Sequence, residues 1–93
     1  MNYRVELRPA ADRQYERLPA AAQAAVLPML RSLGADPRQL GVAAVRERPG
    51  VFRARVGDYR ILFKIDDREC LVSVGRIAHR GTVYKRLKRV SFD

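Results

Sequence analysis

Cysteine and long apolar runs are the two features that this sequence of 93 residues most clearly lacks. Because Cys70 is the only cysteine, the chain has no internal disulfide and no cysteine-rich metal site. We expect Cys70 to be a small buried apolar residue. No apolar run approaches the roughly 20 residues that span a bilayer, and the first residues, MNYRVELRP, lack the apolar core of a signal peptide. These absences favour a cytoplasmic protein that does not bind membranes.

Internal repeats, low-complexity segments and interdomain linkers are absent as well. The chain is therefore predicted to form one domain over residues 1–93. A domain of this size buries only a modest core, so its stability on its own is expected to be marginal. Marginal stability would suit a protein that is stabilised by a bound partner.

One sign of charge predominates in the sequence. Nineteen Lys and Arg residues against ten Asp and Glu residues give a formal net charge of +9. Such an excess on a small domain favours an anionic partner, which can be a nucleic acid, an acidic protein or a membrane surface. Most of these cations are arginines, whose planar guanidinium group suits phosphate and carboxylate. A basic surface without a function is the alternative interpretation.

The first half of the chain predicts a strand followed by two helices. Apolar and charged residues alternate over residues 3–8, which is the pattern of a strand with one buried face. Pro9 can open a helix at its first turn, and a second helix is predicted over residues 20–34. We expect Pro28 to kink or shorten this second helix and Gly34 to cap its carboxyl end.

The second half of the chain predicts a loop and three strands. Residues 35–50 are expected to form a loop that is held in place by Leu40 and also by Val42. A hairpin over residues 51–64, a strand over residues 70–78, and a short helix or extended tail follow. The order β-α-α-β-β-β predicts an α+β domain. Its sheet is expected to be mostly antiparallel and four-stranded, with two N-terminal helices on one face and a short C-terminal helix.

The predicted hairpin segregates its side chains by type. Gly57 and Asp58 form its two-residue loop, and this loop determines which residues of the two strands face each other. Because side chains alternate along a strand, one face is apolar and should lie under the helices. That face carries Phe52, Ala54, Val56, Tyr59, Ile61 and Phe63. The opposite face carries Arg55 facing Arg60, Arg53 facing Leu62, and Lys64 facing Val51.

Four cations on one sheet face indicate a site for anions. Like charges that face each other destabilise a sheet by about 0.2–1 kcal/mol, so the fold gains nothing from placing Arg55 opposite Arg60. The alternative is a solvated face on which arginine side chains cover apolar surface. Both interpretations stay open at this point.

The segment after the last predicted strand adds three candidate residues. His79 and Arg80 follow that strand, and Tyr84 lies one helical turn after Arg80 if the segment is helical. Tyr84 can stack on a base or exchange a proton, although it can equally be a packing residue. His79 can equally be a structural histidine near a strand end.

These motifs resemble the RelE/ParE superfamily of toxins from bacterial type II toxin–antitoxin systems, and most of all RelE. The resemblance covers nearly the whole chain and is carried mainly by VGDYRILF at residues 56–63 and HRGTVY at residues 79–84. It implies a compact microbial-ribonuclease-like fold and an mRNA interferase, which is a ribosome-dependent endoribonuclease that arrests translation without a metal or other cofactor. In that reaction the RNA 2′-OH attacks the neighbouring phosphorus and the 5′-oxygen leaves.

The resemblance also implies roles for individual residues. Carried over by position, the active-site residues it implies are Arg53, Arg55, Arg60, Arg80 and Tyr84. Of these we expect Arg55, Arg60, Arg80 and Tyr84 to be catalytic and Arg53 to bind RNA or phosphate, together with Lys64 of the hairpin face and His79. Some RelE toxins have lysine where this chain has Arg53 and Arg55. Because arginine stays protonated in proteins, Arg55 is a poor general base, and its expected role is to stabilise the charge of the phosphorane. His79 is then a candidate for the missing base.

Two other functions stay open. ParE-type toxins share the fold but inhibit DNA gyrase without cleaving RNA, and a degraded toxin would serve only as a binding module or co-repressor. Every interpretation implies the same partner, an acidic RelB-like antitoxin that folds on the basic toxin. The toxin–antitoxin complex is expected to be heterotetrameric.

Overall fold

Proline residues set the start of both helices in the computed structural model, which describes residues 2–93. Pro9 occupies the first turn of α1 (Pro9–Glu16), where the N–H that proline lacks would have no partner in the helix. Pro19 is the N-cap of α2 (Ala20–Ala35). No helix among the described residues is long and apolar enough to cross a membrane.

Helix α2 continues through Pro28 to Ala35, so the expectation that it would end early was wrong. Pro28 faces solvent, while Val26 and Leu30 on either side of it are buried. A proline inside a helix costs about 3 kcal/mol through its missing hydrogen bond. Burial of two large aliphatic side chains offsets that cost, since each contributes about 1.5–3 kcal/mol.

Gly34 lies inside α2 and is not its C-cap, which is Asp36. Its carbonyl oxygen accepts a hydrogen bond of 2.6 Å from the backbone N–H of Tyr3. A Cβ atom at Gly34 would lie 3.0 Å from the carbonyl oxygen of Tyr3. The glycine therefore permits the close approach of α2 to the chain entering the first strand, a contact that the local sequence pattern did not reveal.

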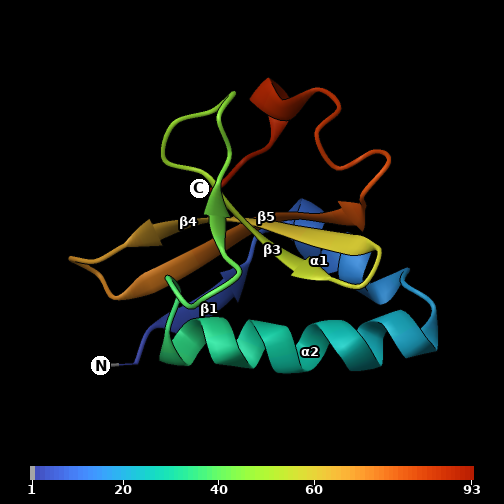
Figure 1. The fold of residues 1–93 in the computed structure, drawn as a ribbon, viewed down its shortest axis with the longest axis horizontal. Coiled ribbons are helices and arrows are strands. Elements are labelled where there is room, and N and C mark those ends of the chain that lie inside the picture. The colour runs from blue at the N-terminus through green and yellow to red at the C-terminus, as the bar shows by residue number, and fades with distance from the viewer. Residues whose placement is uncertain (1) are drawn as a thin grey trace.

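The sheet has five strands in the order β1-β5-β4-β3-β2, and α2 lies across one of its faces (Figure 1). The strands are β1 (Arg4–Leu7), β2 (Ala43–Ala44), β3 (Phe52–Val56), β4 (Tyr59–Asp66) and β5 (Leu71–His79). Strand β1 runs parallel to β5, and the other pairs are antiparallel. The predicted count of four strands was therefore wrong by one, because β2 lies within the segment expected to be a loop.

The predicted register of the hairpin is confirmed. Val56 pairs with Tyr59, Arg55 with Arg60, Ala54 with Ile61, Arg53 with Leu62, and Phe52 with Phe63. Gly57 begins the turn at φ +55°, in the left-handed region that glycine enters without strain. The apolar face of the hairpin joins the helices in the main core, where Phe63 and Ile61 are fully buried.

A second core covers part of the opposite sheet face, which had been expected to face solvent. The C-terminal segment, which comprises residues 80–93 and is red in Figure 1, lies on the side of the sheet away from α2. Its apolar side chains and those before β3 enclose Leu62, which is fully buried. The members of this second core are Val45, Val51, Leu62, Val83, Leu87, Val90 and Phe92.

Three local expectations differ from the structure. The C-terminal helix is reduced to a single 3-10 turn at Leu87–Arg89, preceded by consecutive turns. Leu40 is fully exposed and does not hold the loop, whereas Val42 packs against the main core and Val45 is buried in the second core. Cys70 is only half-buried because it occupies the turn between β4 and β5, at φ +50°.

A candidate anion-binding face

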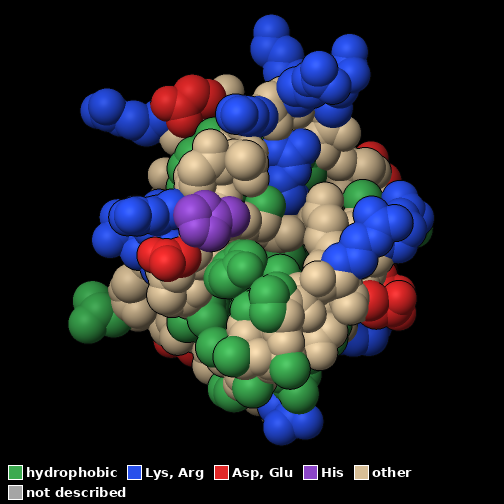
Figure 2. All heavy atoms as spheres, turned by 90° about the vertical axis from the view of Figure 1, so that its right-hand side faces the viewer, with side chains coloured by type: hydrophobic (Ala, Val, Ile, Leu, Met, Phe, Trp, Pro, Cys, Tyr) green, Lys and Arg blue, Asp and Glu red, His purple; other side chains and the backbone are tan. Residues whose placement is uncertain are grey.

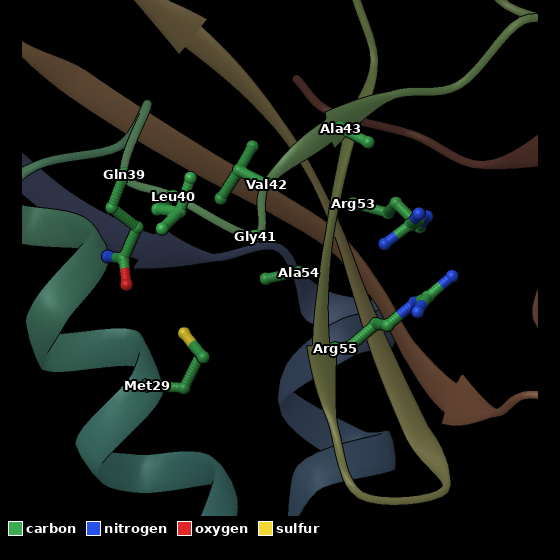
Figure 3. Close-up of a pocket in the computed structure, with 9 residues that line it drawn as sticks. All are labelled: Met29, Gln39, Leu40, Gly41, Val42, Ala43, Arg53, Ala54 and Arg55. Carbon is green, nitrogen blue, oxygen red and sulfur yellow. The ribbon is translucent and has the colours of Figure 1, made fainter.

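Arg53, Arg55 and Arg60 form a basic face on the hairpin. Arg55 lies directly opposite Arg60, and Arg53 occupies the neighbouring row opposite Leu62. In Figure 3 the guanidinium groups of Arg53 and Arg55 extend to the same side of β3. The strand pairing therefore brings the three cations together on the sheet face away from the helices, as the alternation of side chains predicted.

No carboxylate neutralises this basic face within residues 2–93. The ion pairs in that part of the chain involve other arginines, and none reaches Arg53, Arg55 or Arg60. Arg60 instead donates hydrogen bonds from Nη1 to the carbonyl oxygens of Gly57 and Tyr59, both at 2.9 Å. Its guanidinium group is thus held at the hairpin turn with its charge uncompensated.

Arg80 lies at the same end of the sheet. Its backbone N–H donates a hydrogen bond of 2.7 Å to the carbonyl oxygen of Asp58 in the hairpin turn. Its Nε atom is 3.7 Å from Asp58 Oδ1, and both side chains are largely exposed. An exposed pair at this distance contributes little to stability, so a phosphate group can replace the carboxylate as the partner of Arg80.

His79 points to the other face of the sheet. It pairs with Tyr59, whose other partner is Val56 on the helix side. The Tyr59 and His79 rings meet edge to face with centroids 5.8 Å apart. The His79 Nδ1 atom accepts a hydrogen bond of 3.2 Å from the Gly81 N–H, which orients the ring. The structure therefore separates His79 from Arg55 and Arg60 by the thickness of the sheet.

Lys64 lies apart from the three arginines along β4. It lies four positions after Arg60, which corresponds to about 13 Å along a strand. Its ammonium group sits 5.4 Å from the centroid of the Phe92 ring, near the end of the chain. Such a cation–π contact ties Lys64 to the C-terminal segment, and a single phosphate does not span the distance from Arg60 to Lys64.

Tyr84 belongs to the C-terminal segment that crosses the second core. Its side chain is 42% exposed, while the neighbouring Val83 is fully buried. Arg76 of β5, a residue that sequence reasoning missed, donates hydrogen bonds to the carbonyl oxygens of Val83 and Lys85. Its signal in the sequence is a single cation inside the otherwise uncharged run CLVSVGRIA.

A groove of about 460 Å³ lies beside β3, next to α2 and the loop before β2. Met29, Leu40, Val42 and Ala54 are among the residues that line it (Figure 3). The guanidinium groups of Arg53 and Arg55 point away from these apolar side chains in the same view. Arg53 and Arg55 are themselves among the residues that line the groove, so the groove borders the basic face along β3.

The carboxylate with the most strongly perturbed pKa lies at the opposite end of β4. Both oxygens of Asp67 accept hydrogen bonds of 2.8 Å from Arg38, and Oδ1 also accepts one of 2.5 Å from the Tyr3 hydroxyl. Hydrogen bonding from Arg38 is the largest cause that lowers the pKa of Asp67 to about 2. This cluster connects the loop after α2, which carries Arg38, to the turn between β4 and β5, which carries Asp67. It contains no residue of the basic face.

Basic side chains surround the side of the molecule that faces the viewer in Figure 2. Figure 2 shows one side of the molecule, on which Lys and Arg side chains project from the upper part and from both flanks. Apolar side chains gather below them in the same view. This distribution agrees with the net charge of +9 and favours an anionic ligand.

Comparison with solved structures defines the class of protein. The toxin–antitoxin complex RelBE2 from Mycobacterium tuberculosis aligns with a TM-score of 0.77 and 36% identity, covering 86% of this chain and 100% of that chain. A variant of E. coli toxin RelE in the free state aligns with a TM-score of 0.77 and 19% identity, covering 98% and 100%. The fold is that of RelE toxins.

Sequence comparison then defines the family. Residues 5–84 match the family described as ParE toxin of type II toxin-antitoxin system, parDE. Toxin RelG from Mycobacterium tuberculosis is 37% identical over 87 residues, covering 92% of this chain and 100% of RelG. Toxin RelE from the same organism is 33% identical over 88 residues, covering 89% and 87%. The chain belongs to the RelE/ParE superfamily of type II toxins and is RelE-like.

Proposed function

We propose that this toxin is an mRNA interferase that cleaves messages on the ribosome and so arrests translation in the cytoplasm. The observation that carries the proposal is the directly opposed pair Arg55 and Arg60, which has no carboxylate partner within residues 2–93. Opposed cations cost a sheet up to about 1 kcal/mol, so they indicate selection for an anionic ligand. RNA phosphate is such a ligand.

In the proposed reaction the RNA 2′-oxygen gives up its proton to a base and bonds to the adjacent phosphorus, which forms a 2′,3′-cyclic phosphate. The bond from phosphorus to the 5′-oxygen breaks, and the leaving oxygen takes up a proton. Negative charge develops on the phosphorane oxygens in the transition state, and fixed cations stabilise it there. We assign this role to Arg55 and Arg60, with Arg53 binding a neighbouring phosphate. Arg80 is assigned to the leaving-group phosphate, which displaces Asp58 from its exposed ion pair.

Tyr84 is assigned to the nucleobase beside the cut, where an exposed phenol ring can stack and orient the RNA. Its hydroxyl is also a candidate for proton transfer. His79 faces the helix side of the sheet, which argues against its role as the general base and against phosphate binding at the basic face. Lys64, which lies beside Phe92, is assigned to bind the RNA at a phosphate farther from the cleaved bond.

An acidic RelB-like antitoxin is the proposed protein partner. The support comes from the net charge of +9 and from the RelBE2 relative, whose solved structure is a toxin–antitoxin complex. A flexible acidic segment that folds on the toxin would neutralise the basic face and block access of RNA. We propose a complex with two toxins and two antitoxins.

Inhibition of DNA gyrase is the second candidate function. The match of residues 5–84 to the ParE toxin family favours it. Arginine at positions 53 and 55 is compatible with it too, because neither residue can serve as a general base. The two functions differ in which process stops first after induction: translation for the nuclease, and DNA replication for the gyrase inhibitor.

Mapping of mRNA 5′ ends after brief induction in a bacterial host tests the proposal. Wild type is compared with Arg80→Ala and Tyr84→Ala, and with Arg13→Ala as a matched control on exposed α1. We expect new 5′ ends inside translated codons with wild type and Arg13→Ala, and a strong loss of these ends with the other two variants. Growth arrest with intact messages would refute the nuclease and support gyrase inhibition, which a supercoiling assay then measures.

A further inference from the structure

Arg76 occupies a central place on the sheet face that carries the basic residues. It pairs with Leu62 on β4, and Leu62 pairs in turn with Arg53 on β3. The three residues form one row across the sheet, next to the row of Arg55 and Arg60. A register irregularity beside Leu62 and Phe63 accompanies this position, and such bulges redirect side chains.

A single nitrogen of Arg76 holds the backbone on both sides of Tyr84. Its Nη1 atom donates hydrogen bonds of 2.8 Å to the Val83 carbonyl and 2.6 Å to the Lys85 carbonyl. Tyr84 is the residue between these two carbonyls, and its side chain is substantially exposed. Arg76 therefore contacts the segment that presents Tyr84, without an observed bond to the Tyr84 side chain itself.

Next to Tyr84, the other backbone hydrogen bonds lie within the turns: the Val83 N–H donates to the His79 carbonyl and the Lys85 N–H to the Thr82 carbonyl. The segment forms consecutive turns and no α-helix, so its carbonyl groups lack the regular partners of a helix. Val83 anchors one side of Tyr84 in the second core, but Lys85 and Arg86 on the other side are exposed. The Lys85 carbonyl thus depends on the hydrogen bond from Arg76.

The surroundings of Arg76 strengthen its hydrogen bonds to the Val83 and Lys85 carbonyls. Arg76 is half-buried, and burial lowers the pKa of its guanidinium group. No carboxylate pairs with it among residues 2–93. Hydrogen bonds from a charged donor are stronger than those between neutral groups. A partly desolvated guanidinium group without an ionic partner therefore interacts strongly with the two carbonyls.

We infer that Arg76 is a positioning residue: it fixes the backbone on both sides of Tyr84, so that the phenol ring meets RNA in the geometry that cleavage needs. The catalytic part of this inference, the effect of Arg76 on cleavage, rests on the proposed function. The inference does not assign Arg76 a contact with RNA, and its structural part, the immobilisation of Tyr84, stands without any assumption about the reaction.

Arg48, in the loop before β3, provides a matched control because it binds the same C-terminal segment. Its Nη1 atom also donates to two backbone carbonyls, those of Leu87 at 2.9 Å and Val90 at 2.7 Å. These carbonyls lie beyond Tyr84 along the chain. Removal of either arginine side chain loses two hydrogen bonds to the C-terminal segment, but only removal of Arg76 should release Tyr84.

The first experiment measures the mobility of position 84 directly. The chain contains no tryptophan, so Tyr84→Trp introduces the sole indole fluorophore. Adding Arg76→Met should lower its fluorescence anisotropy and raise acrylamide quenching roughly twofold, as expected for a locally released segment. Adding Arg48→Met should leave both near the parent values, and Arg76→Lys, which retains an ammonium donor, should restore them in part. Equal effects of Arg76→Met and Arg48→Met would overturn the inference.

The second experiment is a double-mutant cycle on cleavage of ribosome-bound mRNA. Because a small misplacement of a catalytic group costs up to 100-fold, Arg76→Met is expected to slow cleavage by roughly 10- to 100-fold with little change in affinity for RNA. It should have no further effect in a Tyr84→Ala background, since Arg76 acts through Tyr84. An additive loss, or a weakened affinity for RNA, would overturn the inference and indicate a direct contact between Arg76 and RNA.

The two experiments separate failure of the inference from failure of the proposed function. If wild type cleaves no mRNA, the proposed function fails, and the fluorescence comparison still decides whether Arg76 immobilises position 84. If wild type cleaves but Tyr84→Ala does so equally well, Tyr84 has no role and the catalytic part of the inference is overturned. Should Arg76→Met not fold, Arg76→Gln gives the same comparison with a smaller expected effect.

Discussion

Arg55 and Arg60 oppose each other across the hairpin, and no carboxylate relieves their repulsion within residues 2–93. We therefore expect Arg55→Ala to leave thermal stability unchanged or slightly higher, by up to about 1 kcal/mol. The same substitution should slow cleavage of ribosome-bound mRNA by roughly 100- to 1,000-fold, because it removes a preorganised cation from the transition state. Thermal denaturation and a cleavage assay measure the two effects.

Arg13→Ala is the control for that comparison, since Arg13 is an exposed arginine on α1 away from the basic face. It should change neither stability nor cleavage rate. A stability loss without loss of cleavage in Arg55→Ala would mean that Arg55 serves the fold, and the proposed assignment would be wrong.

The ion pair of Asp67 predicts how the stability of the protein changes in acid. Arg38 is the main cause that lowers the pKa of Asp67 from 3.8 to about 2 in the folded protein. A depressed folded-state pKa contributes stability that is present above the unfolded value and is lost as the pH falls toward about 2. Asp67→Asn should therefore lower the urea midpoint at pH 6 and have little effect at pH 2. An equal effect at both pH values would exclude the charge of Asp67 as the cause.

Among the contacts between secondary-structure elements, strand β5 meets the C-terminal segment at Gly75. A Cβ atom there would lie 2.7 Å from both the Phe92 ring and the Val90 side chain. Gly75→Ala should destabilise the fold by about 1–3 kcal/mol through overpacking of the second core. A loss of about 4–8 °C in melting temperature per kcal/mol is expected for a domain of this size. Gly81→Ala, with its nearest neighbour at 3.5 Å, is the matched control.

Helix α2 makes the converse prediction. Pro28 lies inside the helix and faces solvent, so Pro28→Ala should restore a backbone hydrogen bond without disturbing the core. We expect a gain of about 1–3 kcal/mol in the free energy of unfolding, measured by urea denaturation. A loss of stability would show that the proline bends α2 into a shape that packing on the sheet requires.

The strands show which features of the sheet the local sequence pattern predicts and which it does not. The alternation of side chains and the Gly57-Asp58 turn predicted the hairpin register correctly, because both depend on neighbours in the chain. The same pattern missed β2, whose two residues carry no alternation and are strand only because β3 lies beside them. It also missed the role of Gly34, since its contact with Tyr3 joins the two ends of a long segment.

At the scale of the whole molecule, the net charge of +9 predicts binding of RNA that depends strongly on salt. If Arg53, Arg55 and Arg60 each neutralise one phosphate of a single strand, the logarithm of affinity should fall with the logarithm of salt concentration with a slope of roughly −2 from these three residues. Removing Arg55 and Arg60 together should reduce the slope by about 1.4. Fluorescence titration with single-stranded RNA at several salt concentrations measures this slope. An unchanged slope in the variant that lacks Arg55 and Arg60 would exclude the basic face as the binding site.

Two things about this toxin followed from its sequence alone. The alternation of charged and apolar residues in the hairpin determined that Arg53, Arg55 and Arg60 share one face, and the motifs around residues 56–63 and 79–84 indicated the family. Both are properties of short stretches, where covalent geometry relates one residue to the next.

Tertiary structure alone decided which part of that face is open. The C-terminal segment folds back over Leu62 and Gly75, leaves the arginines near the hairpin turn uncovered, and engages Lys64 through Phe92. Arg76 acquires its partners at Val83 and Lys85 only through this packing. The reason is physical: burial and hydrogen bonding between distant segments depend on where the folded chain returns, and no local period encodes that path.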